Sequence, residues 1–144
     1  MTTIATNGVS VAADGRIVIG TSVFTQSARK IFRIHGEIVG TSGDFSFGDE
    51  YLTWTRQKFC KRLKPKLPPK RAADFFRALH ISKKDVILVD ADMTFLRAIP
   101  PIAIGSGADY ALAAMLQGAT PAEAVAIAAK MDPWTGGNIT EMHL

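Results

Sequence analysis

The pair Asn7-Gly8 constrains the fold of this chain most, because Asn-Gly between two extended segments is the strongest short-range signal for a β-hairpin. The segment from Met1 to Arg16 therefore predicts two paired strands. With a two-residue turn, Thr2 lies opposite Ala13 in this hairpin. The start of the chain is then expected one step from Asp14.

If Met1 is removed, this hairpin gives Thr2 a free α-amine, a hydroxyl and a nearby carboxylate. These groups are the equipment of a threonine nucleophile whose own amine acts as the base. The alternative is that Thr2 only begins an edge strand. The hairpin by itself leaves both interpretations open.

Length and composition predict one domain that spans residues 1–144, which is long enough to bury a proper core. A hydrophobic content of 47% excludes a disordered chain. No apolar run reaches the roughly 18 residues of a membrane span, and the start lacks the pattern of a secretory signal. The single cysteine, Cys60, cannot form an internal disulfide, so a cytoplasmic protein is expected.

Six cations gather in the segment 61–71, which also contains three prolines and so cannot be one helix. A nucleic-acid site would combine a basic face with interleaved aromatic residues or a known reader motif, and the segment has neither. It is expected to be a solvated loop between helices, with contact to an acidic partner surface as the next alternative. Neither nucleic acid nor a membrane is expected as a partner.

A second hairpin is predicted by the alternating segment 30–34, the pair His35-Gly36 and the segment 37–41. A two-residue turn puts Lys30 at the same end of this hairpin as the turn Ser42-Gly43-Asp44. That turn leads into a helix, where outward-pointing backbone N–H groups favour an anion.

Further strands are expected over 17–24, 86–89, 93–96, 102–107 and 138–144, and helices over 46–63, 72–79, from 108, and from Pro121 to Met131 behind a Thr120 cap. This order predicts an α+β fold, a four-layer αββα sandwich of two mainly antiparallel sheets flanked by helices. Asp90 and Asp92 share a turn, where Asp is common for backbone reasons. They have no apparent third ligand, so no metal and no cofactor are expected.

Six segments have an order and spacing typical of one known family. They are Thr2-Thr3-Ile4, Val11 to Arg16, Ser27 to Ile31, Val39 to Gly43, Ile104 to Tyr110, and Asp132 to Gly137. Together they resemble the proteasome β-subunit and its bacterial relative, the peptidase of the HslUV protease. Both are N-terminal nucleophile hydrolases, so the resemblance implies that fold and a threonine-type peptidase.

The resemblance also implies catalytic roles. Thr2, after removal of Met1, would be the nucleophile, with its α-amine as the base. Lys30 would lie beside the Thr2 hydroxyl and favour the alkoxide, and Asp14 would pair with Lys30. The backbone N–H of Gly43 would donate to the oxyanion, a contribution of roughly 2.7–4 kcal/mol.

A second group of residues would surround the amine. Ser106, Asp132 and Thr135 would form its hydrogen-bonded surroundings, and Gly136 would let the backbone approach closely. Thr135 replaces the serine that is common in proteasome subunits, and both side chains offer a hydroxyl. The candidates for the wall of the substrate pocket are Phe32 and the Ile17-Val18 segment.

The partners implied by the resemblance are a polypeptide substrate, identical subunits in a hexamer- or heptamer-like ring, and an ATP-dependent unfoldase. A bacterial or phage origin is expected. Asp44 follows Gly43 and places a carboxylate near the expected oxyanion. One alternative is therefore a catalytically inactive, ring-forming scaffold of the same fold. A separate alternative is a small-amide hydrolase with the same nucleophile.

Overall fold

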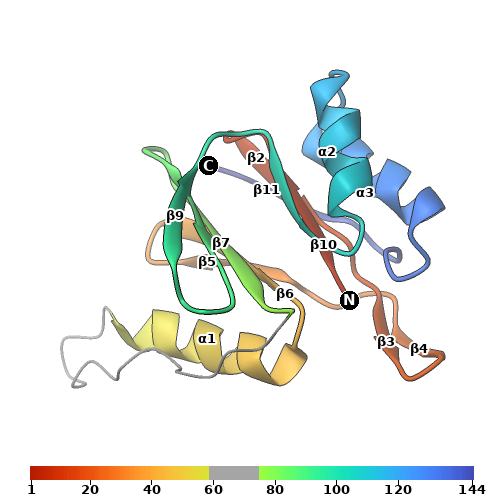
Figure 1. Cartoon of the computed structure of the whole chain (residues 1–144), viewed down its shortest axis with the longest axis horizontal. Coiled ribbons are helices and arrows are strands. Elements are labelled where there is room, and N and C mark those ends of the chain that lie inside the picture. The colour runs from red at the N-terminus through yellow and green to blue at the C-terminus, as the bar shows by residue number, and fades with distance from the viewer. Residues whose placement is uncertain (59–74) are drawn as a thin grey trace.

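Two antiparallel sheets face each other in the middle of the molecule (Figure 1). The computed structural model describes residues 1–58 and 75–144. One sheet has the order β10-β1-β2-β11 and contains β1 (Thr3–Thr6), β2 (Ser10–Ala13), β10 (Ile102–Gly105) and β11 (Thr140–His143). The other has the order β5-β6-β7-β8-β9 and contains β5 (Ile31–Ile34), β6 (Glu37–Ser42), β7 (Arg77–Ile81), β8 (Val86–Val89) and β9 (Phe95–Ala98).

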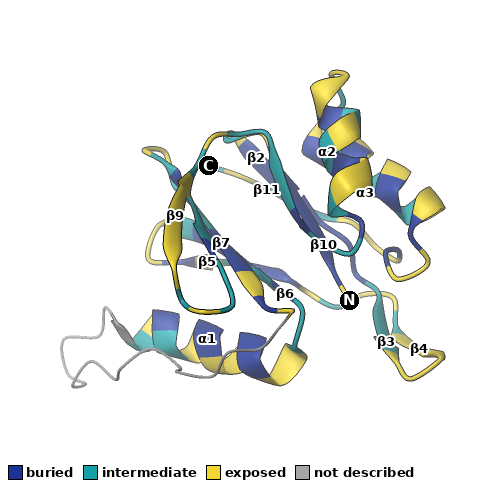
Figure 2. Ribbon diagram, viewed as in Figure 1, coloured by how far each residue is buried: buried dark blue, intermediate teal, exposed yellow. Residues whose placement is uncertain are grey.

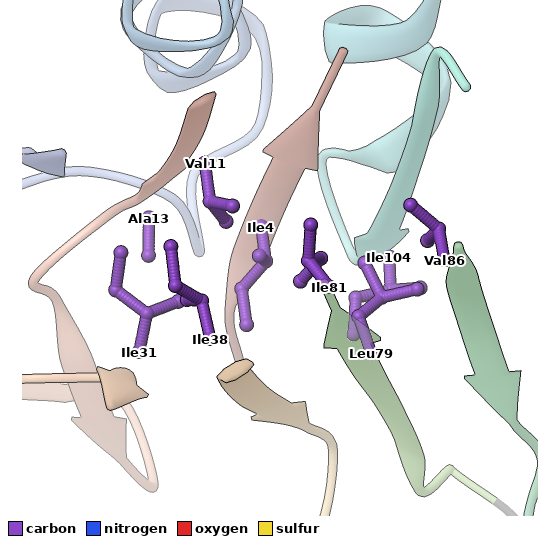
Figure 3. Close-up of a cluster of buried hydrophobic side chains, with 9 residues drawn as sticks. All are labelled: Ile4, Val11, Ala13, Ile31, Ile38, Leu79, Ile81, Val86 and Ile104. Atoms are coloured by element: carbon purple, nitrogen blue, oxygen red, sulfur yellow. The ribbon is translucent and has the colours of Figure 1, made fainter. Parts of the chain in front are cut away.

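The main core lies between these sheets. Alternate side chains of a strand point to opposite faces, so each strand sends one set of apolar residues inward. The set that meets here is drawn in Figure 3: Ile4, Val11, Ala13, Ile31, Ile38, Leu79, Ile81, Val86 and Ile104. All of them are buried, which fixes how the two sheets face one another.

Helices cover both outer faces. The helix α1 (Phe45–Lys58) packs on the five-stranded sheet through a cluster that includes Phe47, Tyr51 and Phe76. The helices α2 (Ala108–Leu116) and α3 (Pro121–Met131) pack on the four-stranded sheet through mostly small residues. Figure 2 shows these faces as buried. The four-layer αββα sandwich and the α+β class are thus confirmed.

Several local predictions also hold. In the β5–β6 hairpin Ile34 pairs with Glu37, and both turn residues, His35 and Gly36, have positive φ values of 49° and 85°. Such a turn is the favoured two-residue hairpin connection. At the start of α3, Thr120 forms the predicted cap, and Glu123 completes a capping box.

No helix in residues 1–58 or 75–144 is long and apolar enough to cross a membrane.

The predicted register of the first hairpin is wrong by two residues. Thr6 pairs with Val11, so the connection is longer than the two residues that Asn7-Gly8 suggested. The Asn7 side chain stabilises this longer loop, since its Oδ1 accepts hydrogen bonds from the backbone N–H groups of Val9 and Ser10. A slip of two residues keeps every side chain on its face. Asp14 therefore still lies at the chain start, beside Thr3.

The helix predicted over 72–79 is wrong in its described part. Residues from Arg77 onward form β7, the central strand of the five-stranded sheet. This strand is covered on both faces, with Leu79 in the main core and Ala78 under α1. A strand buried on both faces has a continuous apolar run, which periodicity cannot distinguish from a helix segment. Cys60, the basic segment 61–71 and the predicted helix end at Leu63 lie outside the described residues.

Three strand boundaries also differ. The segment predicted as one strand over 17–24 is a hairpin of β3 (Ile17–Ile19) and β4 (Ser22–Thr25), which turns at Gly20 with a φ of 60°. The strand β9 starts at Phe95 because Met93, with a φ of 65°, still belongs to the turn. The last strand starts at Thr140, two residues later than predicted.

Candidate active site

A buried carboxylate, Asp14, organises the end of the molecule where the chain begins. Its Oδ1 accepts hydrogen bonds from the Thr3 N–H at 2.9 Å and from the Lys30 ammonium at 2.8 Å. Its Oδ2 accepts from the backbone N–H groups of Arg16 at 3.2 Å and Gly136 at 3.0 Å. The side chain is fully buried. Asp14 thus joins the first strand, the lysine and the turn after α3.

Lys30 lies just before β5, and its ammonium is enclosed by oxygen atoms. It donates to Asp14 Oδ1, to the Arg16 carbonyl at 2.5 Å and to the Met1 carbonyl at 3.0 Å. An ammonium has three N–H donors, so each of them has an acceptor. Burial lowers the pKa of Lys30 below its ordinary value, while the charge and hydrogen bond of Asp14 act in the opposite direction.

The first two residues lie against this lysine. Thr2 is buried, and its carbonyl accepts a hydrogen bond from the Ser106 N–H at 3.0 Å. Gly105 touches the same carbonyl with a φ of 100°, and a Cβ there would lie only 1.5 Å from the oxygen. Burial lowers the pKa of the Met1 amine, and the Lys30 charge lowers it further, against the opposite effects of Asp14 and Asp132.

Gly43 directly follows the last residue of β6 and has a φ of 97°. A Cβ at this position would lie 1.5 Å from the Phe75 carbonyl oxygen, so only glycine fits. Among the described residues its N–H has no hydrogen-bond partner. The neighbouring Asp44 carboxylate caps α1, since its Oδ1 accepts from the Phe47 N–H at 2.8 Å. Asp44 was the reason for the inactive-scaffold alternative, and one of its two carboxylate oxygens is bound to the start of α1.

A chain of hydroxyl groups connects the first strand to Asp132. The hydroxyls of Ser106 and Thr135 both donate to Asp132 Oδ2, at 2.6 and 2.5 Å. The Thr135 proton is used in this bond, so the 2.6 Å contact between the Thr135 and Thr3 hydroxyls must be donated by Thr3. Thr3 Oγ1 in turn accepts from the Gly107 N–H at 3.0 Å. Every donor in this chain therefore has a fixed direction.

The pKa of the Asp132 carboxyl is below its ordinary value. Burial raises this pKa, but the hydrogen bonds from Ser106, Thr135 and the Trp134 N–H lower it, as does the positive N-terminus. The balance favours the ionised form. Asp132 is thus an anion that holds two hydroxyl groups in place.

Two contributors were missed at the sequence level. The Thr3 hydroxyl meets Thr135, and only the folded chain brings these distant residues together. Arg16 donates from Nη1 to the Pro133 carbonyl at 2.9 Å, and its guanidinium packs on Gly136, where a Cβ would lie 2.5 Å from Cζ. The close neighbour at Gly136 is thus a side chain, and the approach of backbone expected there stays a prediction. The proximity of Arg16 to Asp14 in the sequence was the one available signal.

Two cavities meet at Thr2 and Gly43. The larger has a volume of about 440 Å³ and includes the predicted wall residues Phe32, Ile17 and Val18, together with Phe24 and Leu52. The smaller has a volume of about 260 Å³ and is lined on its far side by Phe75, Phe76, Arg77, Asp90, Gly105 and Ser106. Thr2 therefore borders two separate cavities, the larger of which has a mostly apolar wall.

The structure brings the predicted site residues together around the start of the chain. Hydrogen bonds connect Asp14, Lys30 and Gly136 with one another, and Ser106, Asp132 and Thr135 with one another. Thr3 connects the two groups, and Gly43 lines the same two cavities as Thr2. No three metal-ligating side chains cluster in residues 1–58 and 75–144.

Solved structures similar to this chain cover nearly its whole length. Thiobacillus denitrificans BPH has a TM-score of 0.71 at 18% identity, over 99% of this chain and 96% of that chain. The same protein in complex with epoxomicin has a TM-score of 0.70 at 18% identity, over 99% and 97%. HslV from Trypanosoma brucei has a TM-score of 0.70 at 17% identity, over 100% of both chains. No protein-family model and no curated protein matches the sequence.

At these identities the likeness establishes the fold. The chain has the fold of the proteasome β-subunit and HslV, and the resemblance predicted from the six segments is confirmed at this level.

Proposed function

We propose that this protein is a threonine-type peptidase that hydrolyses peptide bonds with Thr2 after removal of Met1. The observation that supports this proposal best is the environment of the Lys30 ammonium. Two of its three N–H donors are bound to Asp14 and to the Arg16 carbonyl, and the third is bound to the carbonyl of Met1. Removal of Met1 releases that one donor beside Thr2 and leaves the other two in place.

The released donor faces a residue that then has all the groups of an N-terminal nucleophile. The Thr2 hydroxyl attacks the carbonyl carbon of the scissile bond, and its proton passes to the Thr2 amine. Lys30 stabilises the alkoxide. The N–H of Gly43, which has no partner within residues 1–58 and 75–144, donates to the developing oxyanion. The positive charge of Lys30 also favours the neutral, basic form of the amine, as it does for the Met1 amine.

The second half of the reaction reverses the proton movement. The C–N bond breaks, the amine gives its proton to the leaving nitrogen, and an ester on Thr2 remains. Water then attacks the ester while the amine removes its proton, and the acid product leaves with Thr2 restored. An α-amine with an ordinary pKa of about 7.7–8.0 suits both roles near neutral pH. Ser106, Thr135 and Asp132 hold the surroundings of the amine.

Similarity to HslV supports the further proposal that the subunits form a homo-oligomeric ring of hexamer or heptamer type in the cytoplasm. The substrate would be a polypeptide, delivered by an ATP-dependent unfoldase. Epoxomicin, which is bound in one of the similar structures, is the first ligand to test for binding beside Thr2.

The test is hydrolysis of casein and of quenched peptides by the purified oligomer, with native mass spectrometry to count subunits. Thr2→Ala should abolish hydrolysis and leave the oligomer intact, whereas Thr2→Ser should retain activity because it keeps a hydroxyl and an amine. An intact ring that hydrolyses nothing after Met1 removal supports the scaffold alternative. Hydrolysis of short amides without hydrolysis of peptides or casein supports the small-amide alternative.

A further inference from the structure

The two cavities lie on opposite sides of one strand end. In the five-stranded sheet β6 lies between β5 and β7. The larger cavity is lined from the β5 side by Lys30 and Phe32, and the smaller from the β7 side by Arg77. Thr2 and Gly43 line both. A peptide that crosses Thr2 therefore has one flanking residue in each cavity.

The position of Ser106 identifies which cavity receives the leaving group. In the proposed reaction the Thr2 amine gives its proton to the leaving nitrogen, so this nitrogen must lie beside the amine. Ser106 binds the Thr2 carbonyl through its N–H at 3.0 Å and Asp132 through its hydroxyl, and the proposed function assigns it to the surroundings of the amine. It lines the smaller cavity and not the larger one. The residue that follows the scissile bond is thus directed into the smaller cavity.

An ion pair lies in this smaller cavity. Arg77, directly across the ladder from Ser42, donates from Nε to Asp90 Oδ1 at 3.2 Å. A guanidinium has five N–H donors, and the other four of Arg77 have no partner in the described part of the chain. Both side chains are partly exposed, at 55% and 44%. Arg77 therefore offers a planar set of donors to a carboxylate that enters the cavity.

We propose that the smaller cavity is the subsite for the residue that follows the scissile bond, and that Arg77 makes it favour a carboxylate side chain there. This inference rests on the proposed peptidase function. Arg77 is the specificity-determining residue, and Asp90 moderates it by occupying one donor and by repelling an incoming carboxylate. The two partners should consequently affect specificity in opposite directions.

The test uses quenched peptides that are identical except for Glu, Ala or Lys directly after the scissile bond, with the cleavage position verified by mass spectrometry. The wild-type protein should prefer Glu to Lys by about fivefold in kcat/KM, the upper size of an exposed charge pair. Asp90→Asn should increase this preference. Arg77→Gln should invert it, because Asp90 then remains without a cation.

A matched control is Arg97→Gln, which removes another partly paired arginine of the same sheet, 4.0 Å from Asp85, that lines neither cavity. It should keep the wild-type preference. Hydrolysis with the same order of Glu, Ala and Lys in all four proteins overturns the inference and leaves the peptidase function standing. If no peptide is hydrolysed by the Met1-processed wild type, the peptidase function fails, and the subsite fails with it.

Discussion

The Lys30 ammonium lies 2.8 Å from Asp14 Oδ1, and both side chains are buried. This ion pair joins the first strand to the start of β5, and its other hydrogen bonds reach Arg16, Gly136 and Met1. A buried ion pair holds each charge in a fixed position away from water. Removal of one partner lowers the stability of the fold, because the other charge then remains buried without compensation.

Asp14→Asn should therefore lower the free energy of unfolding by about 3–5 kcal/mol, because it leaves the Lys30 charge buried without its partner. The double variant with Lys30→Met should lose less than the sum of the two single variants, since neither charge then remains. Urea denaturation at pH 7 measures this coupling. Arg97→Gln, at an exposed pair, should change stability by only about 0.2–1 kcal/mol. Additive losses at Asp14 and Lys30 would contradict the role of the pair.

Thr3→Val should reduce kcat/KM by about five- to tenfold, the rate equivalent of one hydrogen bond of about 1–1.4 kcal/mol. The variant keeps the shape but removes the hydroxyl that donates to Thr135 and accepts from Gly107. Thr6→Val is the matched control, because Thr6 is also fully buried in β1 and its hydroxyl donates to the Ser10 carbonyl away from the site.

Both valine variants should lose stability by about 1–3 kcal/mol in thermal or urea unfolding, since each leaves buried polar groups unsatisfied. Only Thr3→Val should reduce activity and change its dependence on pH. Equal activity of the two variants would show that the Thr3 hydroxyl is structural alone.

Asp132 should make the free energy of unfolding decrease at acidic pH. Its pKa is lower in the folded protein than its ordinary value of 3.8, so the folded state binds the proton more weakly than the unfolded chain does. The resulting stabilisation is present above that ordinary value and is lost as the pH falls through it toward the folded pKa.

Asp132→Asn should accordingly be less stable than the wild type at pH 7, and the difference should shrink as the pH falls below 3.8. Ser106→Ala should have an intermediate effect, because it removes one of the hydrogen bonds that lower this pKa. Urea midpoints from pH 7 to pH 2.5 measure both curves. A difference that is constant with pH would contradict the ionised state of Asp132.

The sequence allowed much of the fold to be predicted where a local signal decides the structure. The turn His35-Gly36 set its hairpin register, and Thr120 with Glu123 set the start of α3. The predicted register of the first hairpin was wrong because the Asn7 side chain stabilises a longer loop. The residues next to Asn7 do not indicate this loop length. The strand β7 was predicted as a helix because it is buried on both faces, and such a strand lacks the alternation of apolar and polar residues that identifies a strand.

The sequence allowed the proximity of the candidate residues to be predicted, but not the contacts that connect them, and their catalytic roles stay predictions. The residues Asp14, Lys30 and Gly43 occupy strand ends that two hairpins bring together. The Thr3–Thr135 contact depends on how α3 and its following turn pack on the sheet, which no local pattern encodes. The same holds for Arg77, which β7 places beside Ser42 only after the sheet has formed.

The central claim is that Thr2, once exposed as the first residue, is the nucleophile. Intact-mass measurement of the purified protein, before and after incubation with a peptide electrophile, tests it most directly. We predict a chain that begins at Thr2 and gains the mass of one electrophile, with the adduct on Thr2 and none on Thr2→Ala. A chain that begins at Thr2 and gains no adduct, or an equal adduct on Thr2→Ala, would contradict the claim.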